Sequence, residues 1–151
     1  MGIKIVQVGA GLRGRQWAGF VKAHPDVECV AIVELDAAAR EKARPMLGHG
    51  CAEFVDVAEA LQKVKADAAL IVSPSSTHAD VATRCLDAGL TVMVEKPLAV
   101  TVEEGRRVLE RAREVGKQVI VAENYRFFPA ERTMLRLLRE QFLGRLDNAI
   151  M

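Results

Sequence analysis

Short apolar runs alternate with longer amphipathic stretches along most of the chain. The apolar runs are rich in β-branched residues and are bounded by Gly, Pro or charged residues, which is typical of strands. They lie at residues 3–9, 27–34, 52–55, 68–73, 90–95 and 118–124. The stretches between them repeat apolar residues at helical spacing. These predict helices at residues 12–24, 37–47, 58–64, 77–89, 102–115 and 130–142.

The strand runs are nearly continuous in apolar residues and do not alternate strictly with polar ones. A strand that is buried on both faces has no solvent side, so this pattern is typical of a parallel sheet covered by helices. The regular succession of strand and helix leads to the same conclusion. The sequence therefore predicts an α/β fold with a doubly wound parallel sheet.

Residues at the predicted helix ends support these boundaries. Gly89 and Gly116 each follow a helical stretch, where a residue in the left-handed conformation commonly closes a helix. Thr101 precedes Glu103 and Glu104, an order that suits a side-chain cap and the positive end of the helix dipole.

Composition and charge exclude several classes of protein. The chain has 151 residues, of which 50% are hydrophobic and 27% charged, with a formal net charge of +1, as in an ordinary globular domain. No run of like charges predicts a nucleic-acid or membrane-surface partner, and no apolar run is long enough to span a bilayer. The first residues lack the features of a signal peptide, so we expect a cytoplasmic protein.

The three cysteines, Cys29, Cys51 and Cys85, are scattered among apolar or small residues. We expect reduced core thiols rather than a disulfide framework. None has another Cys or a His at ligand spacing, so no metal site is predicted.

The first predicted strand runs into the sequence GAGLRG, within which the first predicted helix begins. Gly9, Gly11 and Gly14 match the pattern G-x-G-x-x-G in the strand–turn–helix context that the pattern requires. The first glycine permits a tight turn, the second lets a pyrophosphate approach the backbone, and the third lets the helix pack against the strand. The amides of Leu12 and Arg13 would point at the phosphates. The loop predicts a Rossmann-type dinucleotide site, and a turn that serves only packing is the alternative.

An acid ends the second predicted strand. Glu34 follows Gly14 by about 20 residues, where a carboxylate can accept hydrogen bonds from the ribose of NAD and repel the 2′-phosphate of NADP. Asp36 is a competing acid, and a solvated strand-end carboxylate is the plain alternative. Arg40 could stack on adenine or pair with a 2′-phosphate. The sequence therefore favours NAD and leaves NADP open.

The fourth predicted strand ends at the same edge of the sheet. Ser73 and Pro74 lie at its carboxyl end, where ligands bind in open α/β sheets. Pro74 stops the strand, and Ser76 or Thr77 can cap the helix that follows. His78 falls in the first turn of that helix, either as a wall of a nicotinamide pocket or as a packing or capping histidine.

The fifth predicted strand ends in an acid, a base and a proline. In the segment VMVEKPLAV, Glu95, Lys96 and Pro97 interrupt a run that is otherwise apolar. An ammonium group can stabilise a developing alkoxide, and a proline fixes the turn that holds it. The Lys96–Pro97 bond is a candidate for the cis form. Two solvated charges before a proline turn are the alternative.

These motifs resemble, in order and spacing, the glucose–fructose oxidoreductase/inositol dehydrogenase (Gfo/Idh/MocA) family. The matching segments are GAGLRG, the strand-end Glu34, the SP…TH stretch, AGLTVMVEKPLA and AENYRFFP, and they cover essentially the whole chain. Thr91 is a departure, since many relatives have His there. The resemblance implies an NAD(P)-dependent oxidoreductase that transfers hydride between the nicotinamide and a sugar, polyol or similar hydroxylated substrate.

The resemblance also implies roles for individual residues. Lys96 would hydrogen-bond the substrate hydroxyl and help to remove its proton, while Glu95 would position Lys96 or contact the nicotinamide ribose. Asn124 would lie at the nicotinamide end of the cofactor and Arg126 at a substrate hydroxyl or carboxylate, with an ordinary exposed loop as the alternative. The expected cofactor-binding residues are Gly9, Gly11, Leu12, Arg13, Gly14, Glu34, Arg40, Ser73, Pro74, His78, Glu95, Lys96, Pro97 and Asn124.

Members of the family usually add a larger α+β domain that holds the substrate pocket. We expect residues 1–124 to form the dinucleotide-binding domain and residues 125–151 to begin the second domain, most of which is absent. A truncated chain of this kind would bind NAD but turn over poorly or not at all. The alternatives are a non-catalytic dinucleotide-binding or regulatory module, or the same family with NAD recycled during elimination or glycoside cleavage.

The last predicted helix carries an apolar stripe. An exposed stripe of this kind favours self-association, so we expect a homo-oligomer. The residues that form the stripe are Met134, Leu135, Leu137, Leu138, Phe142 and Leu143.

Overall fold

Six parallel strands form one sheet in the order β3-β2-β1-β4-β5-β6. The computed structural model describes residues 2–142 and 144–145. Each neighbouring pair of strands runs parallel, which confirms the predicted doubly wound α/β fold. The strands are β1 (Ile3–Val8), β2 (Val27–Val33), β3 (Ala52–Phe54), β4 (Ala68–Ile71), β5 (Thr91–Val94) and β6 (Val119–Val121).

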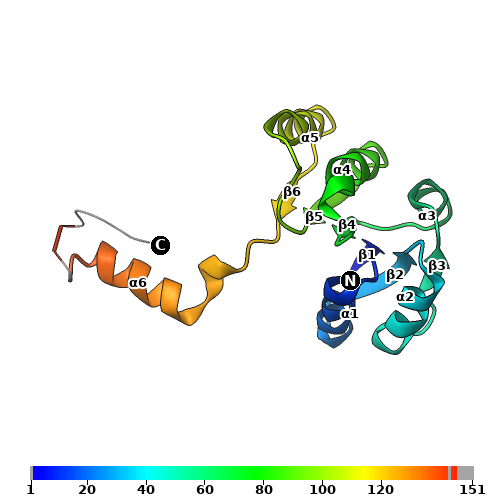
Figure 1. The fold of residues 1–151 in the computed structure, drawn as a ribbon, viewed down its shortest axis with the longest axis horizontal. Coiled ribbons are helices and arrows are strands. Elements are labelled where there is room, and N and C mark those ends of the chain that lie inside the picture. Colours follow the sequence, from blue (N-terminus) through cyan, green and yellow to red (C-terminus); the bar gives the residue numbers. More distant parts are fainter. Residues whose placement is uncertain (1, 143, 146–151) are drawn as a thin grey trace.

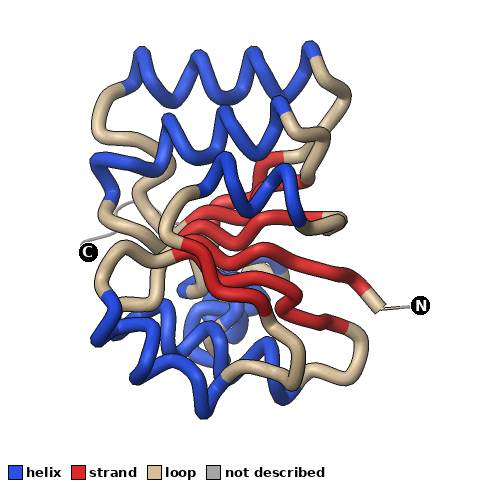
Figure 2. The backbone as a smooth tube through the Cα atoms, turned by 90° about the vertical axis from the view of Figure 1, so that its right-hand side faces the viewer, coloured by secondary structure: helices blue, strands red, loops and turns tan. Residues whose placement is uncertain are grey.

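Helices cover both faces of the sheet (Figure 2). On one face lie α1 (Leu12–Ala23) and α2 (Ala37–Ala43), and on the other lie α3 (Val57–Lys63), α4 (His78–Asp87) and α5 (Val102–Glu114) (Figure 1). The chain moves outward from β1 through β2 to β3 and then returns to the other side of β1 with β4. Open α/β sheets bind ligands at such a reversal, beyond the carboxyl ends of the strands.

Buried strand residues divide between the two faces, because successive side chains of a strand point in opposite directions. Val6 packs in a cluster with Leu86 of α4, whereas the preceding residue, Ile5, packs in a cluster with Val21 of α1. Burial on both faces accounts for the nearly continuous apolar runs of the strands.

The predicted ends of α4 and α5 are confirmed. Gly89 and Gly116, which follow these helices, have φ angles of 80° and 65°, in the left-handed region that favours glycine. At the start of α5, Thr101 Oγ1 accepts a hydrogen bond from the Glu104 N–H at 3.2 Å, and Glu104 Oε2 accepts one from the Thr101 N–H at 3.2 Å. The two bonds form a capping box.

Two predictions at helix ends were wrong. The second helix stops at Ala43, and a 3₁₀ turn (Arg44–Met46) follows, because Pro45 has no N–H with which to continue the α-helical hydrogen bonds. The predicted side-chain cap of α4 is not formed. Thr77 Oγ1 donates instead to the carbonyl oxygen of Pro74 at 2.8 Å, within a 3₁₀ turn that precedes the helix.

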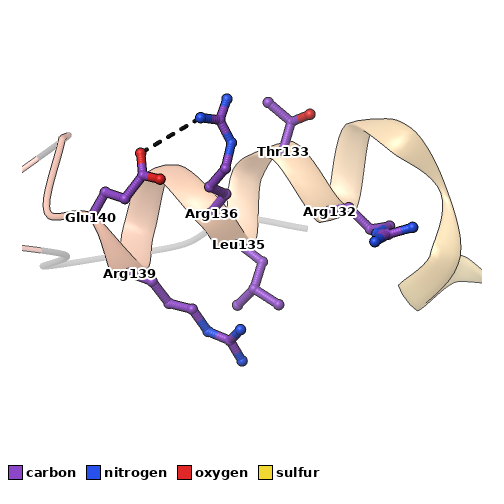
Figure 3. A pocket seen from close by; sticks show the side chains of 6 residues that line it. All are labelled: Arg132, Thr133, Leu135, Arg136, Arg139 and Glu140. Carbon is purple, nitrogen blue, oxygen red and sulfur yellow. Dashed lines mark ion pairs between the residues drawn. The ribbon is translucent and has the colours of Figure 1, made fainter.

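The last helix, α6 (Pro129–Arg139), extends away from the sheet (Figure 1). It follows a 3₁₀ turn (Tyr125–Phe127), and none of its residues is buried. A hollow of about 500 Å³ lies along this helix, and Arg136 and Glu140 in its wall form an ion pair of 3.7 Å. Figure 3 shows the side chains that line it. Residues in or next to one exposed helix line this hollow, and no predicted cofactor-binding residue is among them, so we do not assign it to a cofactor.

Some expectations concern residues that the structure does not describe. Leu143 and residues 146–151, which are part of the range 125–151 where a second domain was expected to begin, lie outside the described ranges. Within those ranges, no helix is long and apolar enough to cross a membrane. The same residues contain no cluster of three or more His, Cys, Asp or Glu side chains that could hold a metal ion.

Candidate dinucleotide-binding site

A hollow lies at the reversal of strand order, beyond the carboxyl ends of β1, β2 and β4. It has a volume of about 290 Å³, and the starts of α3 and α4 also contribute to its wall. Gly9, Glu34, Ser73 and Pro74 all line it. The fold therefore brings together four predicted cofactor-binding residues that are far apart in the sequence.

Packing within the protein requires two of the three loop glycines. Gly9 has a φ of 105°, and a Cβ there would lie 2.7 Å from backbone atoms of Val72 and Ser73. A Cβ on Gly14 would collide with the carbonyl group of Gly9, whose carbon would be 2.9 Å away. The absence of both side chains lets α1 begin directly against the end of β1.

Gly11 differs from both, because nothing in the described part of the chain requires a glycine there. Its φ is −57°, and a Cβ would meet no atom within 4 Å. The first N–H groups of α1, including those of Leu12 and Arg13, have no acceptor within the helix, and its first turn carries no acidic residue. Open space beside free N–H groups at a helix N-terminus fits the pyrophosphate of a dinucleotide.

Gln7 holds the glycine loop from within the sheet. Its side chain is fully buried, and Nε2 donates hydrogen bonds to the carbonyl oxygens of Gly9 and Gly14, each at 2.9 Å. One amide thereby ties the end of β1 to the first turn of α1. Its Oε1 is buried with no partner among the described residues, an arrangement that costs stability. The role of Gln7 was not predicted from the sequence, although a single polar residue within an otherwise apolar strand suggests a buried hydrogen-bonding role.

The carboxylate of Glu34 lies beside the same loop. Its Oε2 accepts a hydrogen bond from the Ala10 N–H at 2.8 Å, and Oε1 accepts one from the Asp36 N–H at 3.0 Å. Asp36 caps α2 by accepting a hydrogen bond from the Ala38 N–H at 2.9 Å. Each carboxylate oxygen can accept more than one hydrogen bond. Glu34 therefore retains the capacity to bind ribose hydroxyls, whereas Asp36 serves as a helix cap.

Arg40 turns back toward the end of β2. Its Nη1 donates to the carbonyl oxygen of Glu34 and, at 3.1 Å, to that of Leu35, while its Nε lies 3.8 Å from Glu53 Oε2. The side chain is only 18% exposed and is not part of the wall of the hollow. The structure therefore places Arg40 as a support for the turn after β2 and does not bring it into the hollow with Glu34.

His78 joins the loops that follow β4 and β5. The ring is almost fully buried, with Nε2 at 2.9 Å from the Ser73 carbonyl oxygen and Nδ1 at 2.7 Å from the Pro97 carbonyl oxygen. A doubly protonated ring would donate to both carbonyls, whereas a neutral ring donates to one. The residue packs behind the loops, and its ring is not exposed toward a ligand.

Glu95 is a buried acid at the end of β5. Its Oε1 accepts hydrogen bonds from Arg13 Nε at 2.6 Å and from Trp17 Nε1 at 2.7 Å, and Oε2 accepts one from the Lys96 N–H at 3.3 Å. Burial alone would raise the pKa of Glu95, but the hydrogen bonds from Trp17 and Arg13 and the charge of Arg13 hold its pKa below the ordinary value. The ionised carboxylate therefore joins the start of α1 to the end of β5.

Trp17 is the second residue that sequence analysis missed. It follows Arg13 by one helical turn, so both side chains lie on one side of α1 and reach the same carboxylate. The helical spacing was visible in the sequence. Their common partner is 78 residues from Trp17, and no local pattern connects the two.

Lys96 borders a second hollow, of about 410 Å³, beyond the end of β5. Its side chain is exposed, and within the described part of the chain its Nζ forms no hydrogen bond or ion pair. The peptide bond between Lys96 and Pro97 is cis, as the sequence suggested. The residues that line this hollow are Arg13, Glu95, Lys96, Asn124, Tyr125 and Phe128.

The two polar residues predicted after β6 have different surroundings. Asn124 lines the hollow beside Lys96. Arg126 does not, and its guanidinium lies 5.5 Å from the centre of the Phe127 ring. The structure therefore brings Asn124 to Lys96 but leaves Arg126 outside the wall of this hollow.

Replacing Glu95 by Gln should destabilise the protein by about 2 kcal/mol at neutral pH, because the charged acceptor of the hydrogen bonds from Arg13, Trp17 and the Lys96 N–H is lost. A carboxylate whose pKa is lowered by folding stabilises the protein above its unfolded pKa of about 4.3, and the contribution disappears as the pH falls through the lower folded value. The difference between wild type and Glu95→Gln should therefore shrink in acid. Urea denaturation at a series of pH values measures it.

The exposed Glu110 provides a matched control for this experiment. Glu110→Gln should follow the wild-type stability at every pH. A Glu95→Gln variant as stable as the wild type at neutral pH would contradict the role of the carboxylate in joining α1 to β5.

Comparisons with known proteins agree with this geometry. The family model Gfo/Idh/MocA, described as an oxidoreductase family with an NAD-binding Rossmann fold, matches residues 3–123. An uncharacterised protein, y4oX, of Sinorhizobium fredii is 32% identical over 98% of this chain and 42% of its own length. Inositol 2-dehydrogenase of Rhizobium meliloti is 28% identical over 97% of this chain and 44% of its own length. The chain thus spans about two fifths of the length of these relatives.

Solved structures show the same arrangement. Scyllo-inositol dehydrogenase from Lactobacillus casei, with bound NAD(H) and scyllo-inositol, has a TM-score of 0.87 at 25% identity, covering 95% of this chain and 43% of that one. The WlbA dehydrogenase from Bordetella pertussis, in complex with NADH and UDP-GlcNAcA, has a TM-score of 0.88 at 26% identity, covering 95% and 41%. The chain belongs to the Gfo/Idh/MocA oxidoreductase family and forms its NAD-binding Rossmann domain.

Proposed function

We propose that the chain binds NAD along the carboxyl edge of its sheet and supplies Lys96 to the oxidation of a sugar, polyol or similar hydroxylated substrate. The observation that carries the proposal is the open space at Gly11, the one motif glycine that no contact within the described protein explains. A group from outside the chain accounts for it, and the free N–H groups beside it select an anion.

The positions of the other side chains support one direction for the cofactor. Glu34 would hold the adenosine ribose, Gly11 and the start of α1 would hold the pyrophosphate, and Lys96 and Asn124 would face the nicotinamide. The negative charge of Glu34 disfavours a 2′-phosphate. Arg40, the side chain that could have offset this charge, is engaged with backbone carbonyls and Glu53. We therefore propose NAD in preference to NADP.

When bound, NAD would supply the acceptor for a hydride from the carbinol carbon of the substrate. As that carbon is oxidised, its hydroxyl group must lose a proton. Lys96 Nζ can hydrogen-bond this oxygen, stabilise the negative charge that develops on it, and take part in removing the proton. Glu95 is already occupied by Arg13, Trp17 and the Lys96 N–H. We assign it to holding the lysine backbone in place.

The relatives support a polyhydroxylated substrate, since inositol 2-dehydrogenase and a scyllo-inositol dehydrogenase are among them. We propose that residues 1–124 form the cofactor domain and that residues 125–151 begin a substrate domain. A non-catalytic dinucleotide-binding module is the second candidate, favoured because Arg126, the predicted substrate contact, lies outside the wall of the hollow that Lys96 borders. Substrate-dependent reduction of NAD by this chain would exclude that candidate.

The variant Gly11→Ala should weaken NAD binding at least about tenfold, or about 1.4 kcal/mol, because its methyl group occupies the space proposed for the pyrophosphate. Isothermal titration calorimetry measures the effect. Gly19→Ala in α1 is the matched control, since a Cβ there also meets no atom within 4 Å. The Gly19→Ala variant should bind NAD as the wild type does. Wild-type affinity in Gly11→Ala would contradict the proposal that the pyrophosphate binds at this loop.

The same titration with NADP tests the role of Glu34. The wild type should bind NADP more weakly than NAD, and Glu34→Gln should reduce the difference, because it removes the charge that repels the 2′-phosphate. Equal affinity of the wild type for the two cofactors would contradict the preference for NAD.

The variant Lys96→Ala should bind NAD as the wild type does, because Lys96 is assigned to the substrate hydroxyl. In a longer form of the protein that carries a substrate domain, it should lose most of the turnover. Calorimetry with NAD and a steady-state assay of NADH formation separate the two effects. Undiminished turnover would remove Lys96 from the mechanism.

We also propose that the chain self-associates through α6. Met134, Leu135 and Phe142, in or just after the helix, are 57%, 47% and 75% exposed, and apolar surface of this kind favours association. The variant Met134→Glu should shift the protein toward the monomer in light scattering at micromolar concentration. The neighbouring Thr133→Glu, at an exposed polar position, serves as the control. A monomeric wild type would contradict the proposal.

A further inference from the structure

Two cysteines meet on the α1 side of the sheet, away from the proposed cofactor. Cys29 of β2 and Cys51, just before β3, have their Sγ atoms 3.8 Å apart. We propose that this pair is an oxidative modification site, at which a peroxide forms a reversible Cys29–Cys51 disulfide. Sequence analysis treated the cysteines as separate core thiols, because nothing local relates two residues 22 positions apart.

The fold places the two residues on neighbouring strands. Ala31 of β2 pairs with Ala52 of β3, and Cys51 directly precedes Ala52, while Cys29 lies two residues before Ala31. Both thiols pack in the apolar cluster that includes Val21 of α1. A disulfide bond is about 2.0 Å long, so the sulfurs must approach further. Cys51 can supply the movement, because it is only partly buried and follows a turn that contains two glycines.

The hydrogen bond between the two thiols shifts their pKa values in opposite directions. The hydrogen bond from Cys51 Sγ, which outweighs the effect of burial, lowers the pKa of Cys29, and the Gln7 and Ala31 backbones add to this effect. The same hydrogen bond to Cys29, together with burial, raises the pKa of Cys51. Cys29 is buried but keeps 8% of its surface exposed. Because the thiolate is the reactive form, Cys29 is the sulfur that reacts first with an oxidant, and Cys51 resolves the product.

The reaction needs only a peroxide. The Cys29 thiolate attacks one peroxide oxygen, the O–O bond breaks, hydroxide leaves, and a sulfenic acid forms. The Cys51 sulfur then attacks the Cys29 sulfur, the S–O bond breaks, and the new S–S bond forms as the hydroxyl leaves with a proton as water. In total the two thiols lose two hydrogen atoms, and hydrogen peroxide is reduced to two molecules of water.

The disulfide would close a ring that contains α2 and Glu34, the segment proposed to face the adenosine ribose. A ring of this kind restricts the unfolded chain. The proposal itself does not depend on cofactor binding, because the thiols lie on the α1 face and not in either hollow at the sheet edge.

Cys85 provides an internal control for the experiment. It is fully buried in α4, and burial raises its pKa to about 12. A thiol of this kind is inert toward peroxide while the protein is folded.

The folded, reduced protein is exposed to hydrogen peroxide, unfolded in guanidinium chloride, alkylated with iodoacetamide and analysed by intact and peptide mass spectrometry. The expected product has lost two hydrogen atoms and carries one alkyl group, on Cys85. Dithiothreitol should restore three alkylated cysteines. Cys85→Ser should still form the disulfide, whereas Cys51→Ser should not, with circular dichroism used to check that each variant is folded.

Three alkylated cysteines after peroxide treatment would overturn the proposal. So would a disulfide that involves Cys85, a disulfide that links two copies of the chain, or irreversible oxidation of Cys29 in the wild type. All of these outcomes are measured on the wild-type protein, so the test does not depend on the folding of any variant.

Discussion

The packing of α1 against the end of β1 governs the rest of the site. Gln7 holds the first turn of the helix through two carbonyl oxygens, and the absence of a side chain at Gly14 permits the close approach. The helix in turn carries Arg13 and Trp17, which donate to the carboxylate of Glu95 at the end of β5. A displacement of α1 would therefore move both the loop proposed for the phosphates and the residue next to the proposed catalytic lysine.

The two ends of the proposed cofactor site differ in how many hydrogen bonds their polar side chains form within the protein. Glu34 and Asp36 each accept backbone hydrogen bonds, and Arg40 donates to carbonyl oxygens, so the adenosine end is held in place without a ligand. The Lys96 side chain has no such partner within the described residues. Polar side chains are hydrogen-bonded within the protein where we propose that the cofactor is anchored, and a polar group remains available where we propose that the reaction takes place.

Periodicity and local helix chemistry were sufficient to predict the succession of strands and helices along the chain. Caps such as Thr101 could be predicted because their partners lie within a few residues. Thr77 was misread as a cap, because a hydroxyl in a tight turn has more than one acceptor within reach. The contact of Trp17 with Glu95 depends on how α1 and β5 are arranged in space. The same is true of Arg40, whose direction depends on carbonyl groups that no residue pattern reveals.

Trp17 is the one tryptophan in the sequence, and its indole N–H is bonded to a buried carboxylate between the two halves of the site. Arg13 also lies over its ring, 5.6 Å from the ring centre. The tryptophan emission of the whole protein therefore comes from a single chromophore whose spectrum responds to the charge at the end of β5. The fluorescence of this tryptophan can therefore be used to follow the region between the glycine loop and the acid–lysine–proline turn.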